Sequence, residues 1–306
     1  MVSMRAKRVW GIVYLGLLAV SGIWKTFFPF SISPMPEQES VTVSIDESAN
    51  SEVEIRFLDT KREIPDSRPS IVLLHGSPMA SSTFDTLLPH LSDKYRLIVP
   101  DLPGFGRSQR SISDYSITAH GLYLEKLLDE LQVTECHLVG YSMGGGVAVE
   151  LCDSRPDLVK SLTLVSSIGL QEYELLGDYT LNHALHAAQL FGFWALDWVV
   201  PHFGYFDRVL LNYRYARNFY DTDQRPLREA MLAWEKPVLI VSGDQDGLVP
   251  YDAAIAHRIV MPQSRLATYE DAGHLAIYRQ PERFGRDLSR FVDDVEIGAA
   301  AHREGS

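Results

Sequence analysis

Short, unbroken runs of apolar residues alternate along the chain with stretches of helical periodicity, and this alternation restricts the fold more than any other feature. The apolar runs occupy residues 71–74, 97–99, 136–139, 162–165 and 238–241. Strands that are covered on both faces of a parallel sheet have this pattern. Helix-spaced apolar positions occupy residues 82–91, 117–131, 144–152 and 253–260. The alternation predicts an α/β fold with a mostly parallel central sheet and helices on both faces.

Two further regions depart from this rhythm. Residues 41–45 and 53–57 alternate apolar and polar side chains, which predicts a hairpin of two half-exposed strands. Residues 170–234 contain no strand pattern but hold 14 of the 32 aromatic residues of the chain. We interpret this region as a helical insertion with an aromatic-rich inner face.

The first 30 residues differ in charge from the rest of the chain. They contain four basic residues and no acidic one, whereas the other 276 residues carry a net charge of −16. Residues 9–24 are uncharged and are followed by Lys25. This predicts an uncleaved transmembrane anchor over 1–30, with the Lys25 ammonium reaching the interface. A signal peptide cleaved after Ser21 and a soluble amphipathic segment are the alternatives.

The distribution of basic residues predicts an orientation. Three basic residues precede the apolar run and one follows it, which keeps the N-terminus in the cytoplasm and places the rest in the periplasm or outside the cell. A cleaved signal peptide would instead give a secreted protein. The acidic remainder is repelled by anionic lipid, so we expect the anchor alone to attach the protein to the membrane. The chain's net charge of −12 also argues against binding to nucleic acid.

Residues 140–144 read Gly-Tyr-Ser-Met-Gly and join the buried run 136–139 to a helical pattern. A G-x-S-x-G sequence at a strand-to-helix turn is a nucleophile elbow, in which strained backbone exposes the serine hydroxyl. The turn tolerates only small residues beside the serine. Ser142 is therefore the candidate nucleophile, close to the positive end of the following helix.

A serine nucleophile needs an anion-stabilising site, a base and an acid. The backbone N–H groups of Ser77, in the loop after run 71–74, and of Met143 are the candidate oxyanion hole. The loops after run 238–241 and after a strand at 266–269 supply an aspartate and His274. Both loops follow strands at the edge where open α/β sheets place their sites.

Over residues 40–295 the chain resembles the α/β-hydrolase fold family. The motifs that carry the resemblance appear in the family's order: His-Gly-Ser-Pro at 75–78, Pro-Asp-Leu-Pro-Gly-Phe-Gly-Arg-Ser at 100–108, the elbow, Gly-Asp-Gln-Asp-Gly-Leu-Val-Pro at 243–250 and Gly-His at 273–274. The resemblance implies that Asp246 is the acid, with Asp244 as the alternative, and that His274 is the base. It also implies His75 as a structural loop histidine.

The resemblance further implies a division into domains. The catalytic domain covers 41–167 and 236–296, and a helical cap covers 168–235. Independently of the resemblance, the polar, proline-containing residues 31–40 predict a linker before the catalytic domain, and the terminal residues 297–306 are expected to form a disordered tail.

Ser142 implies acyl chemistry, since relatives that form an alkyl-ester intermediate use aspartate at the elbow. We therefore expect a serine hydrolase that cleaves a carboxylic ester of an apolar or lipid-like substrate, without metal or cofactor. The alternatives are a C–C bond hydrolase, a cofactor-free haloperoxidase or an acyltransferase on the same triad, and lastly a non-catalytic ligand receptor. Cys136 and Cys152 are expected as buried apolar residues, with a disulfide as the alternative.

Overall fold

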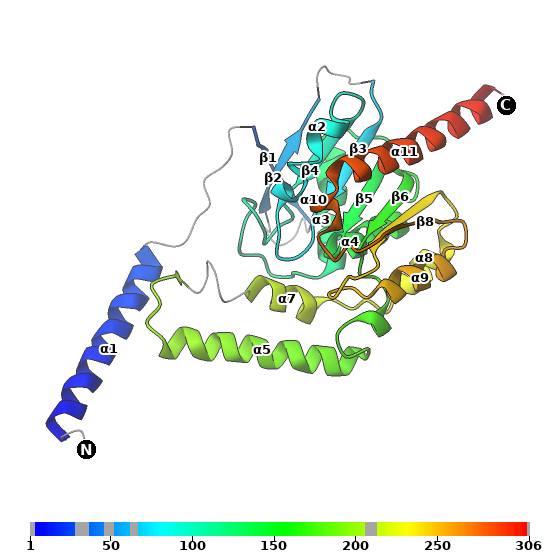
Figure 1. Cartoon of the computed structure of the whole chain (residues 1–306). Helices are drawn as coiled ribbons and strands as arrows, with labels where there is room; N and C mark the ends of the chain where they lie inside the picture. The colour runs from blue at the N-terminus through cyan, green and yellow to red at the C-terminus, as the bar shows by residue number, and fades with distance from the viewer. Residues whose placement is uncertain (1–3, 28–36, 46–51, 62–66, 206–212, 305–306) are drawn as a thin grey trace.

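The computed structural model describes residues 4–27, 37–45, 52–61, 67–205 and 213–304. An eight-stranded sheet forms the centre of the molecule (Figure 1), in the order β1-β2-β4-β3-β5-β6-β7-β8. The antiparallel pairs β1–β2 and β2–β4 lie at one edge, and all other neighbours are parallel. The strands are β1 (Glu39–Ser44), β2 (Glu52–Asp59), β3 (Ser70–Leu74), β4 (Arg96–Pro100), β5 (Cys136–Tyr141), β6 (Val159–Val165), β7 (Val238–Gly243) and β8 (Arg265–Tyr269).

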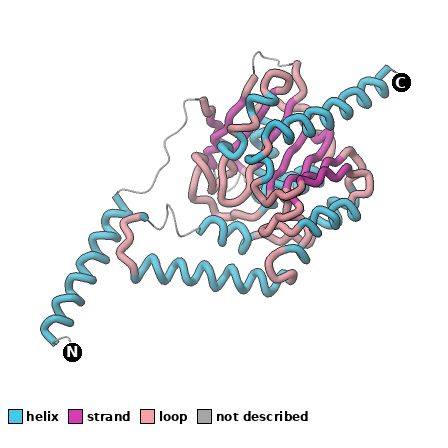
Figure 2. The backbone as a smooth tube through the Cα atoms, viewed as in Figure 1, coloured by secondary structure: helices cyan, strands magenta, loops and turns pink. Residues whose placement is uncertain are grey.

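Helices cover both faces of this sheet (Figure 2), and each face has its own apolar core. One core contains side chains from α3 (Ile117–Glu130), α4 (Met143–Ser154) and α9 (Tyr251–Val260). The other contains side chains from α2 (Leu88–Leu91), α10 (Ala276–Arg279) and α11 (Pro281–Glu304). The buried runs of the sequence are thus explained by two covered faces, and the predicted α/β fold is confirmed.

One predicted helix is wrong. Residues 82–91 form a short 3₁₀ helix, η1 (Ser81–Phe84), and then the single-turn α2. Pro89 lies in the first turn of α2, where its missing N–H is not needed. Within a continuous helix it would remove a hydrogen bond and clash with the preceding turn, so the chain restarts the helix there.

The insertion after β6 is helical, with no strand in its described residues. It comprises η2 (Gln171–Tyr173), α5 (Tyr179–Val199), α7 (Tyr213–Asp221) and α8 (Leu227–Ala233). Helices α5 and α7 pack together on one side of the sheet domain (Figure 1). Helix α8 packs instead against α4, and its Leu227 and Met231 belong to the main core. Helix α7 joins the sheet domain through hydrogen bonds of Asp221 and Asn218 with the backbone of Tyr115.

Both ends of the catalytic region differ from expectation. Strand β1 begins at Glu39, inside the expected linker, whose residues 31–36 lie outside the described ranges. At the other end, α11 is described through Glu304 and so extends into the tail expected from residue 297, whose residues 305–306 lie outside the described ranges. At the N-terminus, α1 (Met4–Phe27) is the single helix of the described chain that is long and apolar enough to cross a membrane. The expected extension of the span to Phe30 lies outside the described residues.

Candidate active site

Ser142 lies between β5 and α4, in the backbone geometry that the sequence motif predicts. Its φ and ψ are 54° and −118°, a conformation that is strained for a residue with a side chain. The backbone N–H of Ser142 donates to the Val165 carbonyl at 2.9 Å, which holds the turn on the neighbouring strand. A Cβ atom at Gly140 would lie 2.4 Å from the Gly144 carbonyl oxygen, and one at Gly144 would lie 2.4 Å from the Leu74 carbonyl oxygen. Both glycines are therefore required by close backbone approach.

His274 and Asp246 are brought together from the loops after β8 and β7. The His274 Nδ1 lies 2.8 Å from Asp246 Oδ2, and the Asp246 side chain is fully buried. Asp246 Oδ1 accepts hydrogen bonds from the backbone N–H groups of Leu248 and Val249 at 2.9 and 3.0 Å. Although burial opposes ionisation, the bonds from His274 and these two amides hold the pKa of Asp246 below its usual value. Asp244 is exposed, so the structure places Asp246, not the alternative, on His274.

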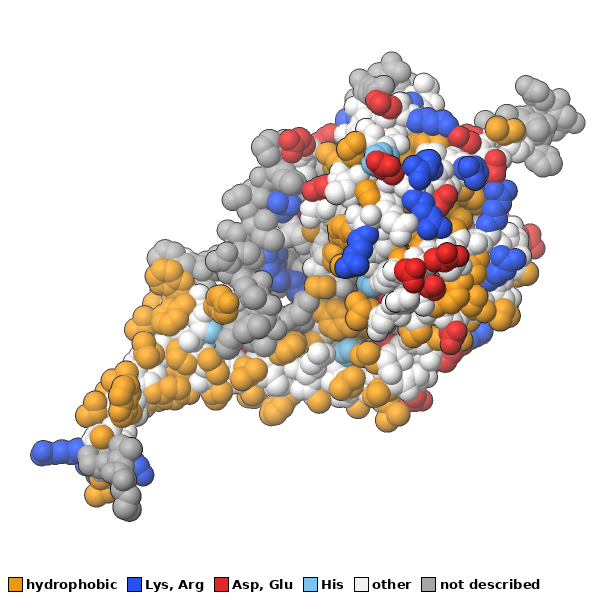
Figure 3. Space-filling model, viewed as in Figure 1, with side chains coloured by type: hydrophobic (Ala, Val, Ile, Leu, Met, Phe, Trp, Pro, Cys, Tyr) orange, Lys and Arg blue, Asp and Glu red, His pale blue; other side chains and the backbone are white. Residues whose placement is uncertain are grey.

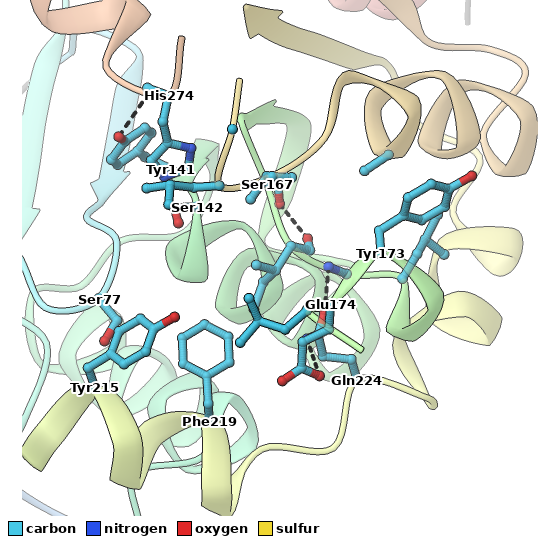
Figure 4. Close-up of a pocket in the computed structure, with 18 of the residues that line it drawn as sticks. Ser77, Tyr141, Ser142, Ser167, Tyr173, Glu174, Tyr215, Phe219, Gln224 and His274 are labelled. Atoms are coloured by element: carbon cyan, nitrogen blue, oxygen red, sulfur yellow. Dashed lines mark hydrogen bonds between the residues drawn. The ribbon is translucent and has the colours of Figure 1, made fainter. Parts of the chain in front are cut away.

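A cavity of about 500 Å³ contains both Ser142 and His274 in its wall (Figure 4). Its base is formed by residues that follow the carboxyl ends of β3, β5, β6, β7 and β8, the edge where ligands bind in open α/β sheets. Tyr215 and Phe219 of α7 close it from the insertion. In the described part of the chain, no hydrogen bond joins Ser142 Oγ to His274, and such bonds are often long before substrate binds.

The end of the cavity away from Ser142 is polar. Glu174 is the single carboxylate among the described residues that line the cavity. It accepts hydrogen bonds from the side-chain amides of Gln171 and Gln224, at 2.6 and 3.1 Å. The cavity therefore combines an apolar wall with one anchored acidic group, and Figure 4 shows Glu174 and Gln224 across it from His274.

Ser77 and Met143, the candidate oxyanion hole, flank Ser142. Ser77 lines the cavity, and a Cβ atom at the preceding Gly76 would lie 2.9 Å from the Ser142 Cβ. Met143 is the first residue of α4, so its amide has no acceptor within that helix. The Ser77 hydroxyl is itself buried without a hydrogen-bond partner among the described residues. Both residues thus lie next to Ser142, as the predicted oxyanion hole requires.

His75 is structural, as expected. It is fully buried, and its Nε2 accepts a hydrogen bond from the Leu102 backbone N–H at 2.9 Å. Burial lowers the pKa of His75, which keeps the ring neutral. The motif at 100–108 does not line the cavity, and it supports the 75–78 loop through this bond instead.

Several residues of the site could not be found from the sequence. The motif allows any residue at position 141 and so does not single out Tyr141. The Tyr141 hydroxyl nevertheless donates to the His274 backbone carbonyl at 3.0 Å. Glu174, Gln224, Tyr215 and Phe219 reach the cavity from an insertion whose packing has no sequence signature. The aromatic enrichment of the insertion was the one available signal for the last two.

The described residues contain no cluster of three or more histidine, cysteine, aspartate or glutamate side chains that could hold a metal ion. Cys136 and Cys152 are free and buried, and burial raises the pKa of Cys136 to about 12. The two thiols therefore behave as small apolar residues of the core.

A family model described as alpha/beta hydrolase fold matches residues 69–212. A pimeloyl-(acyl-carrier protein) methyl ester esterase of Aeromonas salmonicida is 28% identical over 255 residues, covering 73% of this chain and 95% of that protein. A thermophilic esterase from Thermogutta terrifontis superposes with a TM-score of 0.67 at 23% identity, covering 84% of this chain and 99% of the esterase. A bacterial membrane phospholipase A superposes with a TM-score of 0.65 at 20% identity, covering 95% of both chains.

The chain has the α/β-hydrolase fold, on which its sheet order, its strand–turn–helix serine and these similarities agree. The esterases and hydrolases among the similar proteins support a hydrolase.

Proposed function

We propose that the protein is a serine hydrolase that cleaves a carboxylic ester through Ser142, His274 and Asp246. The observation that carries this proposal is the 2.8 Å bond between His274 and the buried Asp246, in the wall of the cavity that also exposes Ser142. An imidazole that is oriented by a buried carboxylate beside a serine is the arrangement that activates a hydroxyl nucleophile.

In this mechanism His274 takes the proton of Ser142 as Oγ attacks the ester carbonyl. Asp246 fixes the histidine tautomer and stabilises the imidazolium, because its carboxylate is held ionised by hydrogen bonds. The backbone N–H groups of Ser77 and Met143 donate hydrogen bonds to the negatively charged oxygen of the tetrahedral intermediate. His274 then protonates the leaving alcohol, and water releases the acyl group from Ser142 by the same steps.

The substrate class follows from the cavity wall. Leu170, Leu175, Leu248 and the two aromatic side chains of α7 give it a mainly apolar surface. An ester with an apolar acyl or alcohol group fits such a wall. The names of the methyl ester esterase and the membrane phospholipase A agree with ester chemistry on acyl substrates.

Helix α1 is proposed as a retained membrane anchor with its N-terminus in the cytoplasm. Ser21 Oγ accepts hydrogen bonds from the backbone N–H groups of His202 and Phe203, both at 3.0 Å. Cleavage after Ser21 would leave no helix at this docking site, so these contacts favour the anchor over the signal peptide. The superposition with the phospholipase covers all but about 15 residues of this chain. Helix α1 has 24 residues, so the superposed part includes some of that helix.

The test is labelling of the full chain in detergent with a fluorophosphonate, followed by kinetics on a panel of p-nitrophenyl esters. We expect one label on Ser142, turnover of medium and long acyl esters, and loss of both in the Ser142→Ala variant. Absence of labelling in folded protein would overturn the serine nucleophile. Labelling with turnover of a vinylogous diketone, but of no ester, would instead establish a C–C bond hydrolase.

A further inference from the structure

Helix α5 and the loop that follows it present an unusually apolar surface to solvent. We call this surface the membrane face. Nine of its apolar side chains are at least 40% exposed: Leu181, Leu185, Phe191, Trp194, Leu196, Trp198, Val199, Phe203 and Tyr205. The rings of Phe191, Trp194 and Trp198 are in contact along the helix, with centroids 5.7 and 6.2 Å apart. Exposed apolar patches of this kind mark interaction sites.

The cap's own packing does not need this surface. The opposite face of α5 carries Asn182 and His186, which are buried against α7. The His186 ring stacks on Phe219 with centroids 5.5 Å apart. From Tyr179 to Leu196 the sequence contains no Lys, Arg, Asp or Glu. Helix α5 therefore has one packed side and one uncharged side with no partner among the described residues.

The contacts between α1 and α5 indicate which partner the membrane face binds. Lys25 Nζ donates a hydrogen bond to Asp197 Oδ1 at 2.6 Å, and Trp24 packs on Phe203 with ring centroids 6.5 Å apart. Nearer the N-terminus of α1, the Tyr14 hydroxyl donates to the Val199 carbonyl. Together with the Ser21 bonds, these contacts join α1 to the end of α5 along most of its second half.

This junction restricts where α5 can lie. A helix that crosses the bilayer through residues 9–27 carries residues 14–25 within or beside the apolar layer. The end of α5 is fixed to that stretch, so it cannot lie away from the bilayer. Figure 3 shows apolar side chains gathered on α1 and along the edge of the molecule that α5 forms. Tryptophan, phenylalanine and tyrosine are the side chains that favour the interfacial layer of a membrane.

We propose that the membrane face docks into the outer surface of a phospholipid bilayer, as a second membrane contact beside α1. Docking buries the aromatic side chains of α5 among the lipids and places the wall of the cavity, through the Phe219 stack, directly above them. The contact is apolar and therefore does not require anionic lipid. The acidic catalytic domain would be repelled by anionic lipid. This inference rests on α1 as the anchor but not on the chemistry at Ser142.

The test uses the full chain in phosphatidylcholine vesicles, with an environment-sensitive bimane probe on a single introduced cysteine. The Trp194→Cys and Phe191→Cys variants label the membrane face at positions that are 57% and 66% exposed. The Ile259→Cys variant is the matched control, since Ile259 is 74% exposed on α9 of the catalytic domain. Ile12→Cys labels α1 itself. The native cysteines are buried and free, and unlabelled wild-type protein measures their background.

Nitroxide-labelled lipid and aqueous iodide then report lipid contact and water contact for each probe. We expect nitroxide lipid to quench the probes at 191 and 194 at least several-fold more than the probe at 259, with iodide giving the reverse order. Quenching at 12 without quenching at 191 and 194 would keep the anchor and overturn docking. Absence of quenching at all four positions would overturn both. Shielding of 191 and 194 from both quenchers, with a cross-linked dimer, would assign the face to a second copy of the chain.

Discussion

The hydroxyl of Tyr141 donates a hydrogen bond to the backbone carbonyl of His274 at 3.0 Å, and the two rings lie with their centroids 5.2 Å apart. Tyr141 directly precedes Ser142, so one residue connects the nucleophile turn to the loop of the proposed base. The tyrosine is buried, and burial raises its pKa, so the hydroxyl keeps its proton and remains a donor. Tyr141 therefore acts as a positioning residue, fixing the distance between β5 and the loop after β8.

The Tyr141→Phe variant tests this role. It keeps the ring but removes the bond, which contributes about 1 kcal/mol. We expect kcat on a p-nitrophenyl ester to fall about 5- to 10-fold with little change in KM, because His274 loses its alignment while the cavity keeps its shape. The matched control is Tyr278→Phe, since the Tyr278 ring packs on Tyr141 and its hydroxyl donates to the Met79 sulfur at 3.9 Å rather than to His274. An equal loss of kcat in both variants would show that general packing, not alignment, is responsible.

Asp246 and Asp244 offer a second matched pair in the same loop. Asp246→Asn keeps the shape of the side chain but favours the wrong histidine tautomer, and we expect kcat to fall by about 10⁴-fold. Asp244→Asn changes an exposed residue and should leave kcat within about 2-fold of wild type. Steady-state kinetics with active-site titration checks both. Loss of activity in Asp244→Asn alone would reverse the assignment of the acid.

The local part of the site was predictable because short motifs determine it. The turn at Ser142 requires small residues at 140 and 144 for steric reasons that the sequence shows directly, and the strand order of a parallel sheet gathers the loops that carry Asp246 and His274. The sequence left Asp244 as an alternative to Asp246, because both residues lie in one loop and the sequence does not show which side chain faces His274. Hydrogen bonds from Leu248 and Val249 decide it.

Other features of the structure depend on tertiary contacts that the sequence does not show. Glu174 reaches the cavity because η2 is held against Gln224 across some 50 residues of chain, which no periodicity encodes. Lys25 pairs with Asp197 on α5, a contact between residues 172 positions apart that the sequence does not show.

Gly144 and Gly146 are neighbours in α4 with opposite tolerance for a methyl group. A Cβ atom at Gly144 would lie 2.4 Å from the Leu74 backbone oxygen, whereas one at Gly146 would meet the side chains of Ile168 and Ile117, at 3.3 and 3.4 Å. We expect Gly144→Ala to abolish activity or folding, because neither backbone can move. Gly146→Ala should change the free energy of unfolding by no more than about 1 kcal/mol, since the gain in helix propensity offsets the close contact. Urea unfolding and esterase activity of the two variants check this, and a fully active Gly144→Ala would contradict the predicted tightness of the turn.

His257 makes the stability of the fold depend on pH. It is 1% exposed in α9, its Nε2 has no hydrogen-bond partner in the described structure, and burial lowers its pKa from 6.5 to about 4. Between these two values the unfolded chain binds a proton that the folded chain does not, so the free energy of unfolding falls as the pH falls through this window. Through His257 alone, the free energy of unfolding falls by up to about 3 kcal/mol across this window. Above the pKa of the unfolded chain, 6.5, none of this loss is present.

We expect His257→Leu to be as stable as wild type or more stable at pH 7, because it removes an unpaired buried polar atom. Between pH 7 and about 4.5, it should lose clearly less free energy of unfolding than wild type, measured by urea denaturation. Some dependence remains, because burial also lowers the pKa of His75 and His120. His90→Leu on exposed α2 is the matched control and should keep the wild-type slope. Parallel pH profiles for wild type and His257→Leu would show that His257 is not buried in its neutral form.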